Sequence, residues 1–319
     1  MKKQESQNSR QIEPSATSLL YEENLEQNVF PDDVCYTILS WLEPRVVAKY
    51  AQVSKQWRRI VSSLEIALDF STHKVGLTGC IGIAQSNYLK HVTHINLNGN
   101  TIGIIGIKTL CNSSNISNIT FLNLKTNHLQ DKGAQILALC DKLKNLTHLD
   151  LTGNNICSPG LNQILTSPYL TNLKILKLGY NNIGDSSMRS LNTCPYMSGI
   201  EELDLGSNRI CERGAQFIAC TNFRNLKHLN LSSNMIGDRG FSHLVASVQF
   251  AQLTHLDVSV NELTNTAMNA LSTTQLLKNL TSLILYGNSI GNETAQLIKD
   301  NTHLSRLTNL DISNMVTRN

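Results

Sequence analysis

Histidine and carboxylate side chains recur at fixed positions of the sequence, and together they could bind a metal ion or transfer a proton. His228 and His255 stand 27 residues apart, and Asp257 follows the second histidine by two residues. Asp204 occupies the equivalent position two periods earlier. On adjacent strands the two imidazoles would lie about 5 Å apart, close enough to share a zinc ion or to pair with a carboxylate. The simpler interpretation, which we favour, is that Thr-His-Leu only fills a solvent-exposed strand position.

No other residues have the spacing of a catalytic or cofactor site. The sequence contains no Gly-rich phosphate loop, HExxH motif or paired CxxC motif. Cys157 and Cys211 share a position but lie two periods apart, roughly 10 Å, which is too far for a disulfide. We therefore expect no enzyme activity, no cofactor and no metal site.

Charge and hydropathy argue against two further classes of partner. The formal net charge of +3 on 319 residues is too small to indicate nucleic-acid or membrane binding. No stretch has the length and apolarity of a membrane span or the apolar core of a signal peptide. We expect a cytoplasmic or nuclear protein.

The element that must position these side chains is a repeat, seen most clearly in residues 146–172. Its marker is an asparagine that returns at intervals of 27 residues, once 26: Asn100, Asn127, Asn154, Asn181, Asn208, Asn234, Asn261 and Asn288. A period of this length is typical of a solenoid, in which no unit can bury its apolar face alone.

Each position of the repeat has a structural reason. Leu146, Leu149 and Leu151 alternate as the buried residues of a short strand do. The asparagine amide can satisfy backbone groups that water does not reach. Six residues later a small residue recurs, which would let the following helix lie close to the strand layer, and ten residues later comes Leu or Ile. Strands and helices therefore alternate, and the strands pair in parallel.

This pattern resembles the leucine-rich repeat, in its ribonuclease-inhibitor-like form. The resemblance implies an α/β solenoid with a curved parallel sheet inside and helices outside. It divides the repeat domain, residues 65–319, into a degenerate first repeat at 65–91, eight full repeats at 92–306 and a truncated last one at 307–319. His73 and Met315 replace the asparagine in the first and last repeats.

Residues 28–64 break the period and predict three short helices. Pro31 suits a first helical turn, Glu43–Pro44 restarts the chain, and Ser54 can cap a third helix. From the pattern alone, this segment is either a separate domain or a helical cap on the first strand of the solenoid. The polar residues 1–27 have little to bury, and we expect them to be disordered.

Phe30-Pro31-Asp32, Ile38-Leu39-Ser40, Leu42 and the run Val53–Arg58 resemble an F-box over its whole length, although Phe30 replaces the usual Leu. F-boxes dock on the Skp-family adaptor of cullin–RING ubiquitin ligases. The resemblance implies these docking residues: Phe30, Pro31, Ile38, Leu39, Leu42, Val53 and Trp57.

The strand residues between the leucines would face the concave side and bind a target protein. Large side chains there either contact the target or cover neighbouring strands. Lysines beside them would favour an acidic stretch of the target, and Glu202 with Asp204 could set its register. The predicted target-binding residues are Phe121, Lys125, His148, Ile175, Lys177, Tyr180, Glu202 and Asp204, with Ile284 and Tyr286 or the convex helices as the second choice.

The sequence thus favours a substrate receptor of an SCF-type ligase. Two alternatives remain open at this point. The chain could be an interaction scaffold whose N-terminal helices only cap the repeats. It could also be a pathogen effector that uses an F-box to enter a host ligase, and it would then act in the host cytosol.

Overall fold

The computed structural model describes residues 66–313 except 87–88, 292–295, 297 and 299–300. The chain divides into two units, residues 1–65 and 66–319, and the second contains all the described residues. Its strands and helices alternate along the chain: β1 (Ile66–Asp69), α5 (Gly76–Gln85), β2 (Val92–Asn96), α6 (Gly103–Cys111), β3 (Phe121–Asn123), α7 (Gln130–Ala138), β4 (His148–Asp150), α8 (Ser158–Leu165), β5 (Ile175–Lys177), α9 (Asp185–Leu191), β6 (Glu202–Asp204), α10 (Glu212–Ala219), β7 (His228–Asn230), α11 (Gly237–Val245), β8 (His255–Asp257), α12 (Asn265–Thr273), β9 (Ser282–Ile284) and β10 (Asn309–Asp311). Short 3-10 helices lie between some of them: η1 (Ser114–Ile116), η2 (Asp141–Leu143), η3 (Met197–Gly199), η4 (Val248–Phe250) and η5 (Thr302–Leu304).

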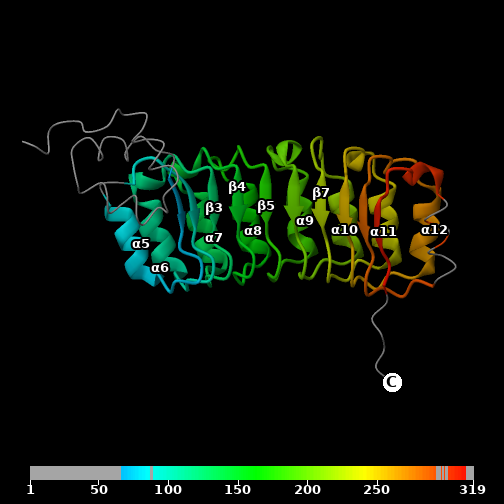
Figure 1. Ribbon diagram of the computed structural model, residues 1–319, viewed down its shortest axis with the longest axis horizontal. Coiled ribbons are helices and arrows are strands. Elements are labelled where there is room, and N and C mark those ends of the chain that lie inside the picture. The colour runs from blue at the N-terminus through cyan, green and yellow to red at the C-terminus, as the bar shows by residue number, and fades with distance from the viewer. Residues whose placement is uncertain (1–65, 87–88, 292–295, 297, 299–300, 314–319) are drawn as a thin grey trace, which may run out of the picture. The chain divides into compact units, whose positions relative to one another are not determined.

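The strands form one parallel sheet in the order of the sequence, β1 to β10. Equivalent residues of neighbouring repeats pair without a shift from β2 onward, as Leu149 on β4 does with Leu176 on β5. Helices pack on neighbouring helices in the same order (Figure 1). The prediction of a leucine-rich-repeat solenoid with an α/β alternation is confirmed. In the part of the chain that the structure describes, no helix is long and apolar enough to cross a membrane.

The core lies between the sheet and the helices. Leu146, Leu149 and Leu151 are at most 1% exposed, whereas His148 and Asp150 between them are half-buried on the opposite face of the sheet. Strands of only three residues hold this register because a shift by one would turn every leucine toward solvent. The opposite face of the sheet, which the sequence predicts to be concave and which we call the concave face, is therefore left free for polar side chains.

The asparagine side chain of each repeat joins two neighbouring turns of the solenoid. The Asn154 amide nitrogen donates to the carbonyls of Leu124 at 2.8 Å and Leu151 at 3.0 Å. Its Oδ1 accepts the backbone N–H of Asn127 at 3.0 Å. Equivalent bonds recur along the array, and all these asparagines are buried except the half-buried Asn181. Each amide satisfies backbone groups that its neighbours leave open.

The residue before each of these asparagines has a left-handed backbone, with φ between 51° and 69°: Gly99, Thr126, Gly153, Tyr180, Ser207, Ser233, Val260 and Gly287. The neighbouring Thr101 is left-handed as well. Glycine adopts this conformation without steric cost, whereas a bulky or β-branched residue does not. Tyr180 and Val260 are therefore held there by the stack on both sides.

The small residues Gly106, Gly160, Gly214 and Gly240 lie against the preceding helix, whereas the sequence analysis related them to the strand layer. A Cβ on Gly240 would be 3.1 Å from both the Ala215 Cβ and the Glu212 Cα of α10. A Cβ on Gly160 would collide with the Asp131 carboxylate of α7. The glycines thus set the spacing between helices.

Some carboxylates of one helix cap the helix of the next repeat. Asp131 accepts the N–H groups of Cys157 at 2.7 Å and Gly160 at 3.1 Å, at the start of α8. Asp185 accepts the N–H of Cys211 at 2.8 Å before α10, and Asp238 does the same for Thr264 before α12. The first N–H groups of a helix lack partners within it, so these acids supply the missing acceptors.

Candidate functional site

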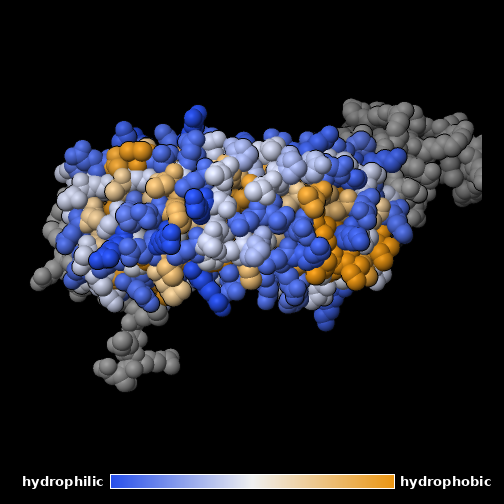
Figure 2. Space-filling view, turned by 180° about the vertical axis from the view of Figure 1, so that it is seen from behind, coloured by the Kyte–Doolittle hydropathy of each residue, from blue (hydrophilic) through white to orange (hydrophobic). Residues whose placement is uncertain are grey.

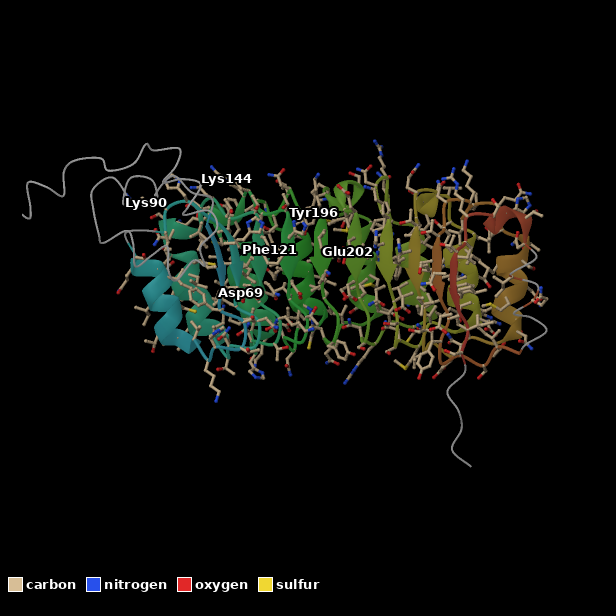
Figure 3. All side chains as sticks on the ribbon, in the orientation of Figure 1. Asp69, Lys90, Phe121, Lys144, Tyr196 and Glu202 are labelled. Atoms are coloured by element: carbon tan, nitrogen blue, oxygen red, sulfur yellow. The ribbon has the colours of Figure 1, made fainter. Side chains whose placement is uncertain are left out.

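The predicted target-binding residues that lie on strands form a continuous row on the concave face. Phe121, His148, Ile175 and Glu202 are direct neighbours in register on β3 to β6. Lys177 and Asp204 pair in the next column. Figure 3 marks Phe121 and Glu202, the two ends of this row. The structure therefore brings these residues together, while Lys125 and Tyr180 follow the strands as exposed loop residues.

Phe121 is held between two histidines. Its ring lies 5.5 Å from that of His94 and 5.8 Å from that of His148, measured between centroids. Such contacts order the aromatic ring and cover the strands below it, yet Phe121 remains half-exposed. Both interpretations of the large concave residues thus apply to Phe121, which covers the sheet and still offers a face to a partner.

Lys177 forms an ion pair with Glu202, whose carboxylate is 2.8 Å from its ammonium group. Burial opposes the charge on Lys177, but the hydrogen bond and attraction of Glu202 outweigh it and raise the pKa of Lys177. The positive charge expected to attract an acidic stretch is thus largely neutralised by this neighbour. Lys125 stays exposed and has no ion-pair partner among the described residues.

Tyr180 combines exposure with an unfavourable backbone. Its side chain is 71% exposed, and its φ of 54° is left-handed. Glycine occupies the equivalent position in other repeats, as at Gly153 and Gly287. A large aromatic residue that is both solvated and strained commonly marks a contact site. The sequence identified Tyr180 as a large aromatic residue on this face, but it did not reveal its left-handed backbone.

A second feature lies farther along the sheet, between β6 and β8. His228 and His255 stack with centroids 4.2 Å apart and planes at 10°. They border a hollow of about 360 Å³ whose wall includes Glu202, Asp204 and Asp257. We call this the β6–β8 hollow. Burial lowers the pKa of His228, as does the neighbouring His255, so the imidazole favours its neutral form.

The β6–β8 hollow does not have the ligand set of a metal centre. Over the described residues, no three His, Cys, Asp or Glu side chains are placed to hold an ion. The cysteines among the described residues are free thiols.

The helix side offers a different surface. Seen from behind in Figure 2, apolar residues gather toward the end where α5 and α6 lie. The large exposed apolar residues of α5 and α6 and after α7 are Leu77, Ile81, Ile105 and Leu139. This patch is more apolar than the concave row, and the sequence named the convex helices as a second choice for the target.

The predicted adaptor-binding residues lie outside the described residues. They are Phe30, Pro31, Ile38, Leu39, Leu42, Val53 and Trp57. The same holds for the predicted disorder of residues 1–27.

Comparison with known families decides what the two parts of the chain are. The family model described as F-box-like matches residues 28–66. The model described as Leucine Rich repeat matches residues 88–111, 115–138, 142–164, 169–191 and 224–244. The chain is an F-box/leucine-rich-repeat protein. The repeats of this F-box/leucine-rich-repeat protein extend beyond the matched segments. Strand β6 and helix α10, at 202–219, lie between two of these segments and follow the same alternation.

Both matched families are protein-interaction modules, so the chain is an interaction adaptor of the F-box type. No curated protein matches this F-box/leucine-rich-repeat protein. Among solved structures it is similar to an internalin from Listeria monocytogenes str. 4b F2365. The two chains are 19% identical with a TM-score of 0.41, and the match covers 85% of this chain and 95% of the internalin.

Proposed function

We propose that this protein is a substrate receptor of an SCF-type cullin–RING ubiquitin ligase. In this role the F-box docks on a Skp-family adaptor and the concave face of the repeats captures a target protein. The observation that carries the proposal is the F-box-like match at 28–66, followed directly by repeats that expose a row of large and charged side chains. The chemistry of ubiquitin transfer belongs to the other subunits of the ligase.

The adaptor half of the proposal is tested with purified full-length chain and a Skp-family adaptor. We expect binding by calorimetry at micromolar concentration, and we expect Pro31→Ala with Leu42→Ala to abolish it. Circular dichroism should show the repeats of the double variant still folded. A wild-type chain that fails to bind the adaptor would refute the receptor role and leave a helical cap on an interaction scaffold.

The target half is tested by proximity labelling followed by pull-down of the labelled protein. Tyr180→Ala and Ile175→Ala should each weaken target capture by roughly 1–3 kcal/mol, as truncation of interface anchors does. Adaptor binding should not change. Val248→Ala, 67% exposed and outside both the concave row and the apolar patch on α5 and α6, is the matched control. Full target affinity in both concave variants would move the site to Ile284 and Tyr286 or to the convex helices.

A further inference from the structure

Two cysteines of neighbouring repeats meet on the helix side of the sheet. Cys111 is the last residue of α6, and Cys140 lies between α7 and η2. The Cys140 Sγ lies 3.7 Å from the carbonyl oxygen of Cys111, and therefore within about 6 Å of the Cys111 Cα. The two thiols are also hydrogen-bonding partners of each other. The fold thus forms a dithiol from two cysteines that stand 29 residues apart in the sequence.

The same two positions in the adjacent repeats show that a dithiol is not what the fold requires there. Ser113 and Ser167 occupy the position of Cys140, and their hydroxyls donate to the carbonyls of Ala84 and Ala138 at 2.8 and 2.6 Å. Those alanines occupy the position of the other cysteine. A thiol is a weaker donor than a hydroxyl, so the hydrogen bond to the preceding helix favours serine. The pair of thiols therefore calls for a reason other than packing.

Both cysteines line a hollow of about 610 Å³ that is bordered by α6 and α7. We call it the α6–α7 hollow. Ile105 and Leu139 contribute exposed apolar side chains to its wall, and Lys142 contributes a positive charge. Cys111 is half-buried rather than enclosed. A molecule as small as hydrogen peroxide can therefore reach the pair from solvent.

The surroundings of the pair favour a thiolate at Cys140. The hydrogen bond from Cys111 lowers the pKa of Cys140, and the backbone N–H and the charge of Lys142 add to this effect against the opposing effect of burial. The same hydrogen bond, together with burial, raises the pKa of Cys111. Asp141 opposes a thiolate, but its carboxylate is 2.9 Å from the Lys142 ammonium group in an ion pair. One thiol is thus prepared to react first, and the other stands beside it.

We propose that Cys111 and Cys140 form a reversible disulfide when hydrogen peroxide oxidises Cys140. The Cys140 thiolate attacks one peroxide oxygen, the O–O bond breaks, and the other oxygen takes up a proton and leaves as water. The Cys111 thiol then attacks the sulfur of the resulting sulfenic acid. The S–S bond forms, the S–O bond breaks, and the hydroxide leaves with the Cys111 proton as a second water. Two electrons pass from the two sulfurs to the peroxide.

The bond would join the end of α6 to the turn after α7. A disulfide requires its sulfur atoms about 2.05 Å apart, and the Cys140 sulfur already lies beside the backbone of Cys111. Thiol reductants reverse the reaction by thiol–disulfide exchange. In a reducing compartment such a bond is transient and senses oxidant. The inference does not depend on the proposed ligase role.

The test uses the reduced full-length chain and hydrogen peroxide, followed by alkylation of free thiols, trypsin and mass spectrometry. Trypsin places Cys111 in peptide 109–125 and Cys140 in peptide 133–142. We expect these two peptides to become linked, with a mass two hydrogen atoms below their sum, and dithiothreitol to separate them. In guanidinium chloride, pairing should instead spread over the eight cysteines of the chain.

Cys194 is an internal control. It occupies the position of Cys140 two repeats later, but Leu165 stands where the second thiol would be. Burial raises the pKa of Cys194. We therefore expect Cys140 to lose its free thiol at least about tenfold faster than Cys194.

Variants separate the roles of the two thiols. In Cys111→Ser, Cys140 should still react, and its sulfenic acid should be captured by dimedone. Cys140→Ser retains the hydrogen bond that Ser113 makes, so circular dichroism should not change, and Cys111 should remain unmodified. Lys142→Gln should slow the oxidation of Cys140 severalfold. Lys132→Gln, the same change at another lysine of the α6–α7 hollow, should not.

An excess of peroxide that leaves peptides 109–125 and 133–142 unlinked would overturn the proposal, whether Cys140 stays free or is oxidised to a sulfinic acid. Equal reaction rates of Cys140 and Cys194 would overturn it as well. Neither measurement involves the adaptor or the target, so failure of the ligase role would leave this inference untouched.

Discussion

At the scale of single residues, Asn154 shows how one side-chain amide per repeat satisfies backbone groups of its own repeat and of the preceding one. Asn154→Ala removes the side-chain acceptor of the buried N–H of Asn127. It also removes one of the two amide donors to each of the carbonyls of Leu124 and Leu151, which keep Asn127 and Asn181. We expect a loss of roughly 1–3 kcal/mol in the free energy of unfolding, measured in urea. Asn181 should lose less when changed to Ala, because it is half-buried.

The control is Asn269→Ala on the exposed face of α12. Alanine favours a helix, so this change should be neutral or slightly stabilising. Equal losses in the free energy of unfolding of Asn154→Ala and Asn269→Ala would show that the buried amide does not stabilise the fold.

Substitutions at Tyr180 can separate the energetic cost of its left-handed backbone from the role of its side chain in target capture. An L-residue in the left-handed region costs roughly 1–2 kcal/mol, and glycine avoids this while losing up to about 1 kcal/mol through its freer unfolded chain. Tyr180→Gly should therefore melt at the same temperature as the wild type or above it, whereas Tyr180→Val should melt below it. Both should lose target capture. A Tyr180→Gly protein that melts well below the wild type would mean that the ring itself stabilises the fold.

Asp204 makes stability depend on pH in an unusual direction. Its folded-state pKa is raised, mainly by burial, above the ordinary 3.8. The folded state therefore binds more protons than the unfolded state between these two pKa values, and stability falls as the pH rises through that window. Asp204→Asn should be more stable than the wild type at pH 7, and the advantage should vanish below about pH 3.8.

Asp311 provides the opposite sign. The side-chain hydrogen bond from Ser313 lowers its pKa, so Asp311→Asn should reduce stability at pH 7 and have no effect in acid. The free energy of unfolding of Asp204→Asn and Asp311→Asn, measured across one pH series, tests both pKa directions. A stability change of the same sign in the two variants at pH 7 would contradict them.

At the scale of elements, carboxylates that cap the next helix join one repeat to another. Asp185 accepts the N–H of Cys211 ahead of α10, at 2.8 Å. Asp185→Ala should cost about 0.5–2 kcal/mol, the usual range for a lost helix cap. The matched change Asp141→Ala removes an exposed carboxylate with no such role and should stay within about 0.5 kcal/mol. Identical unfolding curves for the two variants would show that the cap is dispensable.

The elements also show what sequence reasoning can reach. The spacing of the leucines and asparagines predicted the strands, their parallel order and the concave columns, because each is a local consequence of the repeat. The Lys177–Glu202 pair, the raised pKa of Asp204 and the Asp185 cap depend on rotamers and on which of several neighbours a side chain meets. Periodicity carries no such information. The left-handed position of Tyr180 was equally hidden, since other repeats place Thr, Ser, Val or Gly there.

At the scale of the repeat array, each helix and strand contacts mainly its immediate neighbours. In such arrays opening starts at the ends, and the central units are protected from two sides. Backbone amides of β5, as at Leu176, should therefore exchange hydrogen more slowly than those of β10, as at Leu310. Mass spectrometry of exchanged peptides measures this gradient. Uniform protection from β2 to β10 would instead indicate one cooperative unit.

The in-order pairing of the strands also determines how the array responds to force. A pull on its two ends loads every strand pair in series, across hydrogen bonds that resemble one another from repeat to repeat. A repeat that yields shortens the folded stack by about 4.8 Å and releases 27 residues, roughly 90–100 Å of extended chain. Stretched between two anchors, the array would lengthen in nearly equal steps and limit the tension that one anchor transmits to the other.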